Sequence, residues 1–200
     1  MDKRIRQFSK YYRSIITKNE MTDIDDKVKA YEAKLKEMYD SEAFTKHNVY
    51  PSMSVDWIYA VIVMCRIFKE EGISKDQILN MLNDSFEDIY RSAKKVIKLL
   101  DHLPCTFAIA KLWNKNDHKA RVKDWSISYE YFKVEKNQIS YKINKCMYKE
   151  IFEYYGLGEY CKVFCNTDTM AYECLTRHVK FIRHSDLADG DSCWDEVVKR

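Results

Sequence analysis

The spacing of apolar residues changes once along this 200-residue chain, and that change limits the folds open to it. Before about residue 120, apolar side chains recur every three or four positions, as they do in amphipathic helices. Further along the chain they alternate with polar residues, as they do in half-buried strands. The alternating residues are Trp125, Ile127, Tyr129 and Tyr131, followed by Ile139, Tyr141 and Ile143. The sequence therefore predicts helices first and a β-hairpin after them.

The helical part has one segment that is apolar on nearly all sides. Pro51 breaks the preceding pattern, and Ser54 is a candidate N-cap for a helix through Trp57–Cys65 that ends at Gly72. Because an all-round apolar helix belongs in a core, we expect this one to be the most buried.

A long helix is expected next, since Ser74 and Gln77 have the spacing of a capping box. That helix should end before Pro104, and Phe107–Trp113 predicts a shorter one.

The last third of the chain mixes both patterns. Helical spacing returns over 148–155 and 159–176, Val179–Arg183 is a candidate strand, and the segment from Cys193 can return as its hairpin partner. Only four Gly and two Pro argue against an all-β fold. We therefore expect one α+β domain over residues 1–200. A helical part (1–120) packs on a small antiparallel sheet with C-terminal helices (121–200).

Composition excludes several classes of function. A net charge of +3 does not indicate a nucleic-acid partner, and the longest apolar run, Trp57–Cys65, is far too short for a membrane span. The start of the chain has no apolar secretion signal, so we expect a cytoplasmic protein whose seven cysteines are reduced.

Five side chains of the last third are candidates for a site. Cys161, Cys165 and Asp168 lie at i, i+4 and i+7 of an expected helix, which places them on one face. Cys146 ends the expected hairpin and Cys193 begins the last strand. Four thiols and a carboxylate can therefore converge.

Three interpretations of these cysteines remain open. They can be small buried hydrophobes. They can hold zinc, although the spacing offers only one loose C-x3-C pair, and we expect no metal. They can include a nucleophile, which needs a nearby positive charge such as His178, His184 or Arg183 because Cys165 is expected in mid-helix.

A further set of short motifs carries a family resemblance. The motifs are Cys146, Phe164-Cys165-Asn166-Thr167-Asp168, Phe181-Ile182-Arg183, Leu187-Ala188-Asp189-Gly190-Asp191 and Cys193-Trp194-Asp195. Together they resemble the C-terminal half of the L-2-amino-thiazoline-4-carboxylic acid hydrolase family. In that family the last Cys directly precedes Asp, whereas Trp194 intervenes here, so we expect only one of Cys193 and Asp195 to keep its family position.

The resemblance implies a hydrolase that opens a cyclic amidine and gives an N-carbamoyl amino acid. Cys165 is then the candidate nucleophile and Asp168 holds the amidinium. The other catalytic candidates are Cys146, Cys193 and His178, and the substrate-binding candidates are Arg183, through a bidentate fork, and Asp195. The expected partner is a small-molecule substrate with no cofactor, and a homo-oligomer is compatible with the sequence.

Two other functions remain open from the sequence. One is a non-catalytic domain that binds a small ligand or a metal, and the other is a tailoring protein for a sulfur-containing metabolite or peptide.

Overall fold

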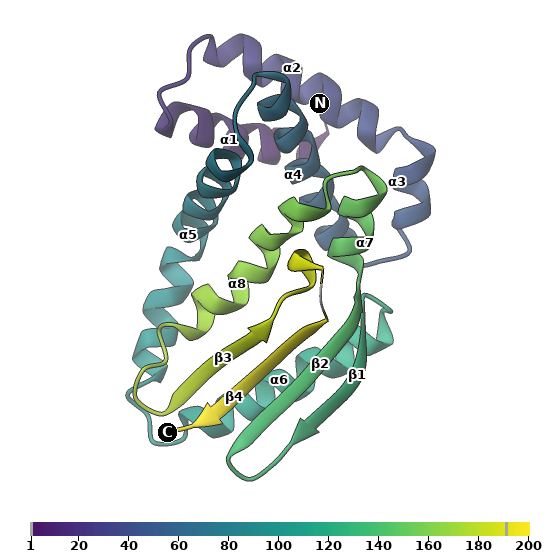
Figure 1. Ribbon diagram of the computed structural model, residues 1–200. Helices are drawn as coiled ribbons and strands as arrows, with labels where there is room; N and C mark the ends of the chain where they lie inside the picture. The colour runs from purple at the N-terminus through teal and green to yellow at the C-terminus, as the bar shows by residue number, and fades with distance from the viewer. Residues whose placement is uncertain (1, 191) are drawn as a thin grey trace.

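The computed structural model describes residues 2–190 and 192–200, so Asp191 of the last loop motif lies outside the described residues. Helices come first and a small sheet with further helices follows, which confirms the α+β class (Figure 1). The first helices are α1 (Lys3–Lys18), α2 (Ile24–Tyr39), α3 (Glu42–His47), α4 (Ser52–Glu70), α5 (Lys75–Leu100) and α6 (Thr106–Lys123).

Helix α4 forms the centre of the helical core, as its apolar sequence predicts. Every residue from Ile58 to Cys65 is at most 1% exposed. The helix begins at Ser52, so the expected N-cap Ser54 is wrong. Pro51 occupies the N-cap position, and Ser54 lies within the first turn. Gly72 follows the helix with a φ of 76°, a left-handed conformation that suits glycine.

The sequence predicts the start of α5 correctly but not the end of α6. The capping box of Ser74 and Gln77 is present at the start of α5, as expected. Helix α6 continues ten residues beyond the expected end at Trp113, because no Gly or Pro interrupts it before the turn at Trp125. Trp125 has a φ of 59° and precedes the strand rather than belonging to it.

The sheet is antiparallel with the strand order β1-β2-β4-β3. Its strands are β1 (Ile127–Val134), β2 (Gln138–Cys146), β3 (Val179–Ser185) and β4 (Cys193–Lys199). The expected β1–β2 and β3–β4 hairpins are both formed. Strand β4 lies between β3 and β2 and so joins the two hairpins into one sheet.

Among the described residues, three shorter elements connect the two hairpins, and a fourth lies in the loop between β3 and β4. They are α7 (Met147–Tyr154), the 3-10 turn η1 (Gly158–Cys161), α8 (Lys162–Tyr172) and the 3-10 turn η2 (Leu187–Asp189). The helix expected over 159–176 is thus divided, and Cys161 lies in η1 rather than in α8.

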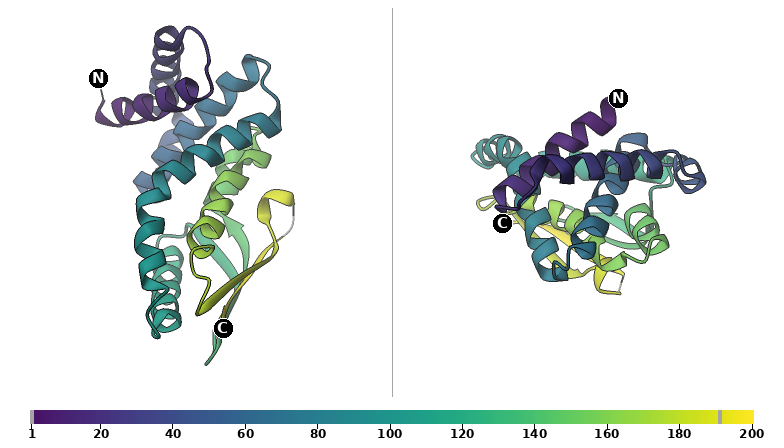
Figure 2. Two further views of the ribbon diagram at one scale, coloured as in Figure 1. Left: turned by 90° about the vertical axis from the view of Figure 1, so that its left-hand side faces the viewer. Right: turned by 90° about the horizontal axis from the view of Figure 1, so that it is seen from above.

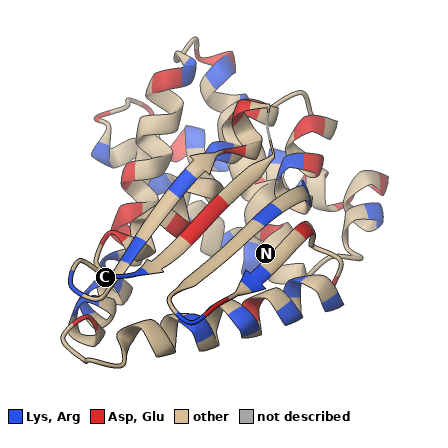
Figure 3. Ribbon diagram, turned by 60° about the horizontal axis from the view of Figure 1, so that its bottom comes forward, with Lys and Arg blue, Asp and Glu red and all other residues tan. Residues whose placement is uncertain are grey.

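One face of the sheet is covered by helices. Helix α8 packs between α5 and β3, and α6 packs on β1 (Figure 2). The opposite face carries charged side chains such as Lys142 and Glu196, and acidic and basic residues are interspersed over the molecule (Figure 3). The covered face, with Tyr141 and Val197 in a second apolar cluster, forms one wall of a cavity.

Candidate active site

A cavity of about 470 Å³ lies between the covered face of the sheet and the helices α4, α5, α6 and α8. Its wall includes five of the seven side chains expected to have a catalytic or substrate-binding role. These are Cys146, Cys165, Asp168, Arg183 and Cys193. The end of β2, the strands β3 and β4 and the helix α8 thus bring together residues that are up to 47 positions apart in the chain.

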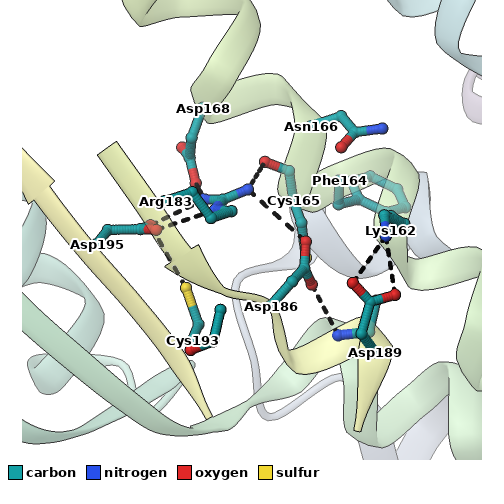
Figure 4. A network of polar contacts seen from close by, with 12 residues as sticks. Lys162, Phe164, Cys165, Asn166, Asp168, Arg183, Asp186, Asp189, Cys193 and Asp195 are labelled. Carbon is teal, nitrogen blue, oxygen red and sulfur yellow. Dashed lines mark hydrogen bonds and ion pairs between the residues drawn. The ribbon is translucent and has the colours of Figure 1, made fainter. Parts of the chain in front are cut away.

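Arg183 is the centre of the polar network in this wall (Figure 4). Its Nε and Nη2 donate to the two carboxylate oxygens of Asp195 at 2.9 and 2.8 Å. Its Nη1 donates to the backbone carbonyl of Cys165 at 2.6 Å, and Nη2 also reaches Asp168 at 3.3 Å. The bidentate fork expected to bind a substrate carboxylate is therefore occupied by Asp195.

Asp195 lies behind Arg183 and does not line the cavity. Its side chain is 1% exposed and also accepts from the hydroxyl of Tyr141 at 3.3 Å and the thiol of Cys193 at 3.4 Å. With four donors its oxygens are satisfied, so Asp195 positions Arg183 and has no free oxygen aimed at a ligand.

Cys193 and Asp195 share one face of β4, and the expectation that only one of them keeps its family position stays a prediction. Side chains two apart on a strand share a face, so both point inward while Trp194 faces outward and stacks on His184.

Asp168 presents a carboxyl group to the cavity. Burial among the cavity walls raises its pKa to about 6 and Asp195 adds to this rise, while Arg183 acts in the opposite direction. The side chain keeps 57% of its surface accessible, because that surface faces the open cavity. This carboxyl group is thus poised to change charge near neutral pH and can meet a ligand directly.

The thiol of Cys165 has surroundings that disfavour a thiolate. Cys165 is the fourth residue of α8, so it lies in the first turn rather than in mid-helix. The adjacent thiol of Cys161, burial and the carboxylate of Asp186 all raise the pKa of Cys165. The guanidinium of Arg183 contacts the carbonyl oxygen of Cys165 and is otherwise bound to carboxylates.

Cys146 has surroundings of a different kind. It is the N-cap residue of α7, and the first-turn N–H groups of Tyr148 and Lys149 favour its thiolate. Arg121 acts in the same direction. Burial, to which the thiol of Cys161 adds, outweighs these groups and raises the pKa of Cys146 to about 11. Backbone dipoles and a cation are nevertheless the features that activate cysteines in proteins.

Helix α6 contributes two charged residues that the sequence analysis missed. Asp117 and Arg121 line the cavity one turn apart, and the Nε of Arg121 donates to Asp117 at 3.2 Å. The terminal nitrogens of Arg121 have no carboxylate partner among the described residues. The signal was their i, i+4 spacing after Trp113, which the early helix end concealed.

His178 is not brought to the site. It precedes β3, five residues from Arg183, and it is not part of the cavity wall. Its backbone N–H donates to Asp101 at 3.4 Å. Across the described ranges, no three His, Cys, Asp or Glu side chains are grouped as a metal site would require.

The model of the L-2-amino-thiazoline-4-carboxylic acid hydrolase family matches residues 56–195. The chain belongs to this family. The resemblance inferred from the short motifs is thereby confirmed, and the hydrolase match covers Cys146, Asp168 and Arg183 as well as Asp117 and Arg121 of α6. No curated protein and no solved structure matches the chain. No helix in the described part of the chain has both the length and the apolar character that a membrane span requires.

Proposed function

We propose that this protein opens the ring of a 2-amino-thiazoline-4-carboxylate by hydrolysis and releases an N-carbamoyl amino acid. The observation that carries the proposal is one cavity that combines a thiol at a helix N-terminus, Cys146, with the carboxyl groups of Asp117 and Asp168. A thiol and carboxylates suit a substrate that is both electrophilic and cationic, as a protonated cyclic amidine is.

The carboxylate of Asp168 binds the amidinium in this proposal. A protonated amidine has N–H donors that a carboxylate accepts, and its positive charge makes the ring carbon more electrophilic. Arg183 already balances Asp195 and Arg121 is paired with Asp117, so Asp168 leaves the site with one carboxylate in excess of its guanidinium groups. That excess favours a cationic ligand over a neutral one.

Cys146 is the nucleophile in this proposal, in place of Cys165. Its thiolate adds to the amidine carbon, the bond from that carbon to the ring sulfur breaks, and the released sulfur takes up a proton. The resulting thiouronium on Cys146 keeps every atom of the substrate. Water then adds to the same carbon, the thiolate of Cys146 leaves, and the product is a urea, the N-carbamoyl group.

Arg121 binds the substrate carboxylate in this proposal, because Asp195 already occupies the bidentate fork of Arg183. We expect Arg121→Ala to raise KM for 2-amino-thiazoline-4-carboxylate by roughly tenfold or more, as the loss of a charge-assisted hydrogen bond would. For 2-amino-thiazoline, which has no carboxylate, KM should stay unchanged. Steady-state kinetics on both compounds tests this, with Lys123→Ala on the exposed side of α6 as the control. Equal losses on both compounds would contradict the role.

The pH dependence of activity should follow Asp168. Its pKa of about 6 means that the carboxyl group is neutral below that pH and charged above it. Because the amidinium needs the charged form, kcat/KM should rise as the pH increases through about 6. In Asp168→Asn the activity should be low and this limb absent, whereas Asp84→Asn on the exposed face of α5 should keep it. An unchanged limb in Asp168→Asn would exclude this carboxyl group.

The direct test of the reaction is the appearance of a thiol. Breaking the bond between the ring carbon and sulfur frees one thiol for each ring that opens, and a thiol reagent measures it after the protein is removed. We expect catalytic thiol release from 2-amino-thiazoline-4-carboxylate. Binding without turnover would overturn the proposal in favour of a non-catalytic binding domain, and release of an amine instead would overturn the proposed product.

A further inference from the structure

The cavity is larger than the ring compound needs. 2-Amino-thiazoline-4-carboxylate has roughly ten non-hydrogen atoms, and at no more than about 30 Å³ for each it fills about 300 Å³. The cavity measures about 470 Å³ and lies in the range of cavities that bury larger ligands. A substantial part of the cavity is therefore left over when the ring is bound.

The reacting side chains and Trp113 occupy different ends of this cavity. On α6, Arg121 and Trp113 both line it and are eight residues apart, which is about 12 Å along a helix. Arg121 lies beside Tyr148, near Cys146. Trp113 stacks on Tyr172, the last residue of α8, with ring centroids 6.4 Å apart. The reacting end and the Trp113 end are thus separated along α6.

Helix α5 extends the apolar end. It runs beside α8, because Asn83 contacts Asn166 at 3.1 Å and Lys94 contacts Glu173 further along. This register places Ile89, which lines the cavity, next to the second half of α8.

The cavity opens to solvent at this apolar end, as it also does beside Met53 at the start of α4. Ile89 and Trp113 line it, yet they are 45% and 51% exposed, so their apolar surface faces solvent in the absence of a ligand. Exposed apolar surface at the rim of a cavity is typical of a ligand-binding surface. An amino acid-sized zwitterion would leave this surface uncovered.

We propose that the natural substrate carries an apolar group, aromatic or aliphatic, on the exocyclic nitrogen of the thiazoline ring. The inference rests on the proposed function for the orientation of the ring. With the carboxylate on Arg121 and the ring carbon at Cys146, the exocyclic nitrogen faces Asp168 and the space beyond it. A substituent on that nitrogen extends between Trp113 and Ile89. The substrate class is N-substituted 2-amino-thiazoline-4-carboxylates.

Binding of two ring analogues tests the inference without turnover. The analogues are 2-aminothiazole-4-carboxylate and 2-(benzylamino)thiazole-4-carboxylate, whose aromatic rings resist opening. Calorimetric titration should give a Kd roughly tenfold or more lower for the benzyl compound, as burial of one aromatic group would. Trp113→Ala and, to a lesser extent, Ile89→Ala should reduce this preference. Leu112→Ala is the control, because Leu112 is an exposed neighbour outside the cavity wall.

Equal Kd values for the two analogues would overturn the inference, as would a benzyl preference that both Trp113→Ala and Ile89→Ala leave intact. The proposed function is tested separately by thiol release from the unsubstituted thiazoline. Turnover without a benzyl preference refutes this inference alone, and a benzyl preference without any turnover refutes the proposed reaction alone.

Discussion

Replacing Cys146 with serine should lower kcat for ring opening by about a thousandfold or more, because a serine hydroxyl at this position has no base to activate it. Cys165→Ser is the matched control, since both thiols line the same cavity. We expect Cys165→Ser to retain kcat within about tenfold. Steady-state thiol release, with circular dichroism to confirm folding, measures both variants. The reverse order of losses would assign the nucleophile to Cys165.

The physical reason for this order is the field at each sulfur. The first-turn N–H groups of α7 and the guanidinium of Arg121 favour a thiolate at Cys146. The thiol of Cys161 disfavours a thiolate at both positions, but at Cys165 it does so as the largest effect, through a side-chain hydrogen bond, and the carboxylate of Asp186 adds to it. A substrate cation in the cavity adds positive charge close to the sulfur, which acts against burial and lowers the raised pKa of Cys146 when the substrate is bound.

Replacing Asp195 with alanine should produce the largest loss of stability among these variants, about 3 kcal/mol or more in the free energy of unfolding. The change leaves the guanidinium of Arg183, which is 16% exposed, without its bidentate partner. It also removes the acceptor of the Tyr141 hydroxyl. Urea denaturation at neutral pH measures the loss. Glu196→Ala is the control on the same strand, because the pair of Glu196 with His184 lies on the solvent face.

A further variant, Asp195→Asn, separates the charge of this side chain from its role as a hydrogen-bond acceptor. Asp195→Asn keeps an acceptor for Arg183 and Tyr141 but removes the charge, so we expect an intermediate loss of stability. If Asp195→Ala and Glu196→Ala cost the same, Asp195 does not hold Arg183 in the way the contacts indicate.

Much of the fold was predictable because apolar spacing is a local property. The all-round apolar stretch identified α4 as the buried helix, and the two alternating segments identified the hairpin of β1 and β2. The extent of α6 was not predictable in this way. Its second half packs a polar stripe, including Asp117 and Arg121, against the cavity, so no apolar periodicity marks it.

The candidate site was predicted as a set of residues but not as a network. The family motifs identify Arg183 and Asp195, yet only the register of β3 with β4 places the two directly opposite each other. That register brings the carboxylate to the fork of Arg183, which the sequence analysis assigned to the substrate. Local patterns contain no information on which long-range partner a side chain finds.

The central claim is that the thiol of Cys146 forms a covalent bond to the ring carbon. Rapid quenching of the protein with excess 2-amino-thiazoline-4-carboxylate, followed by peptide mass spectrometry, tests it most directly. We predict an adduct with the full mass of the substrate on the peptide that contains Cys146, absent from Cys146→Ser and retained in Cys165→Ser. Turnover with the adduct on Cys165, or with no adduct on any cysteine, would contradict the account.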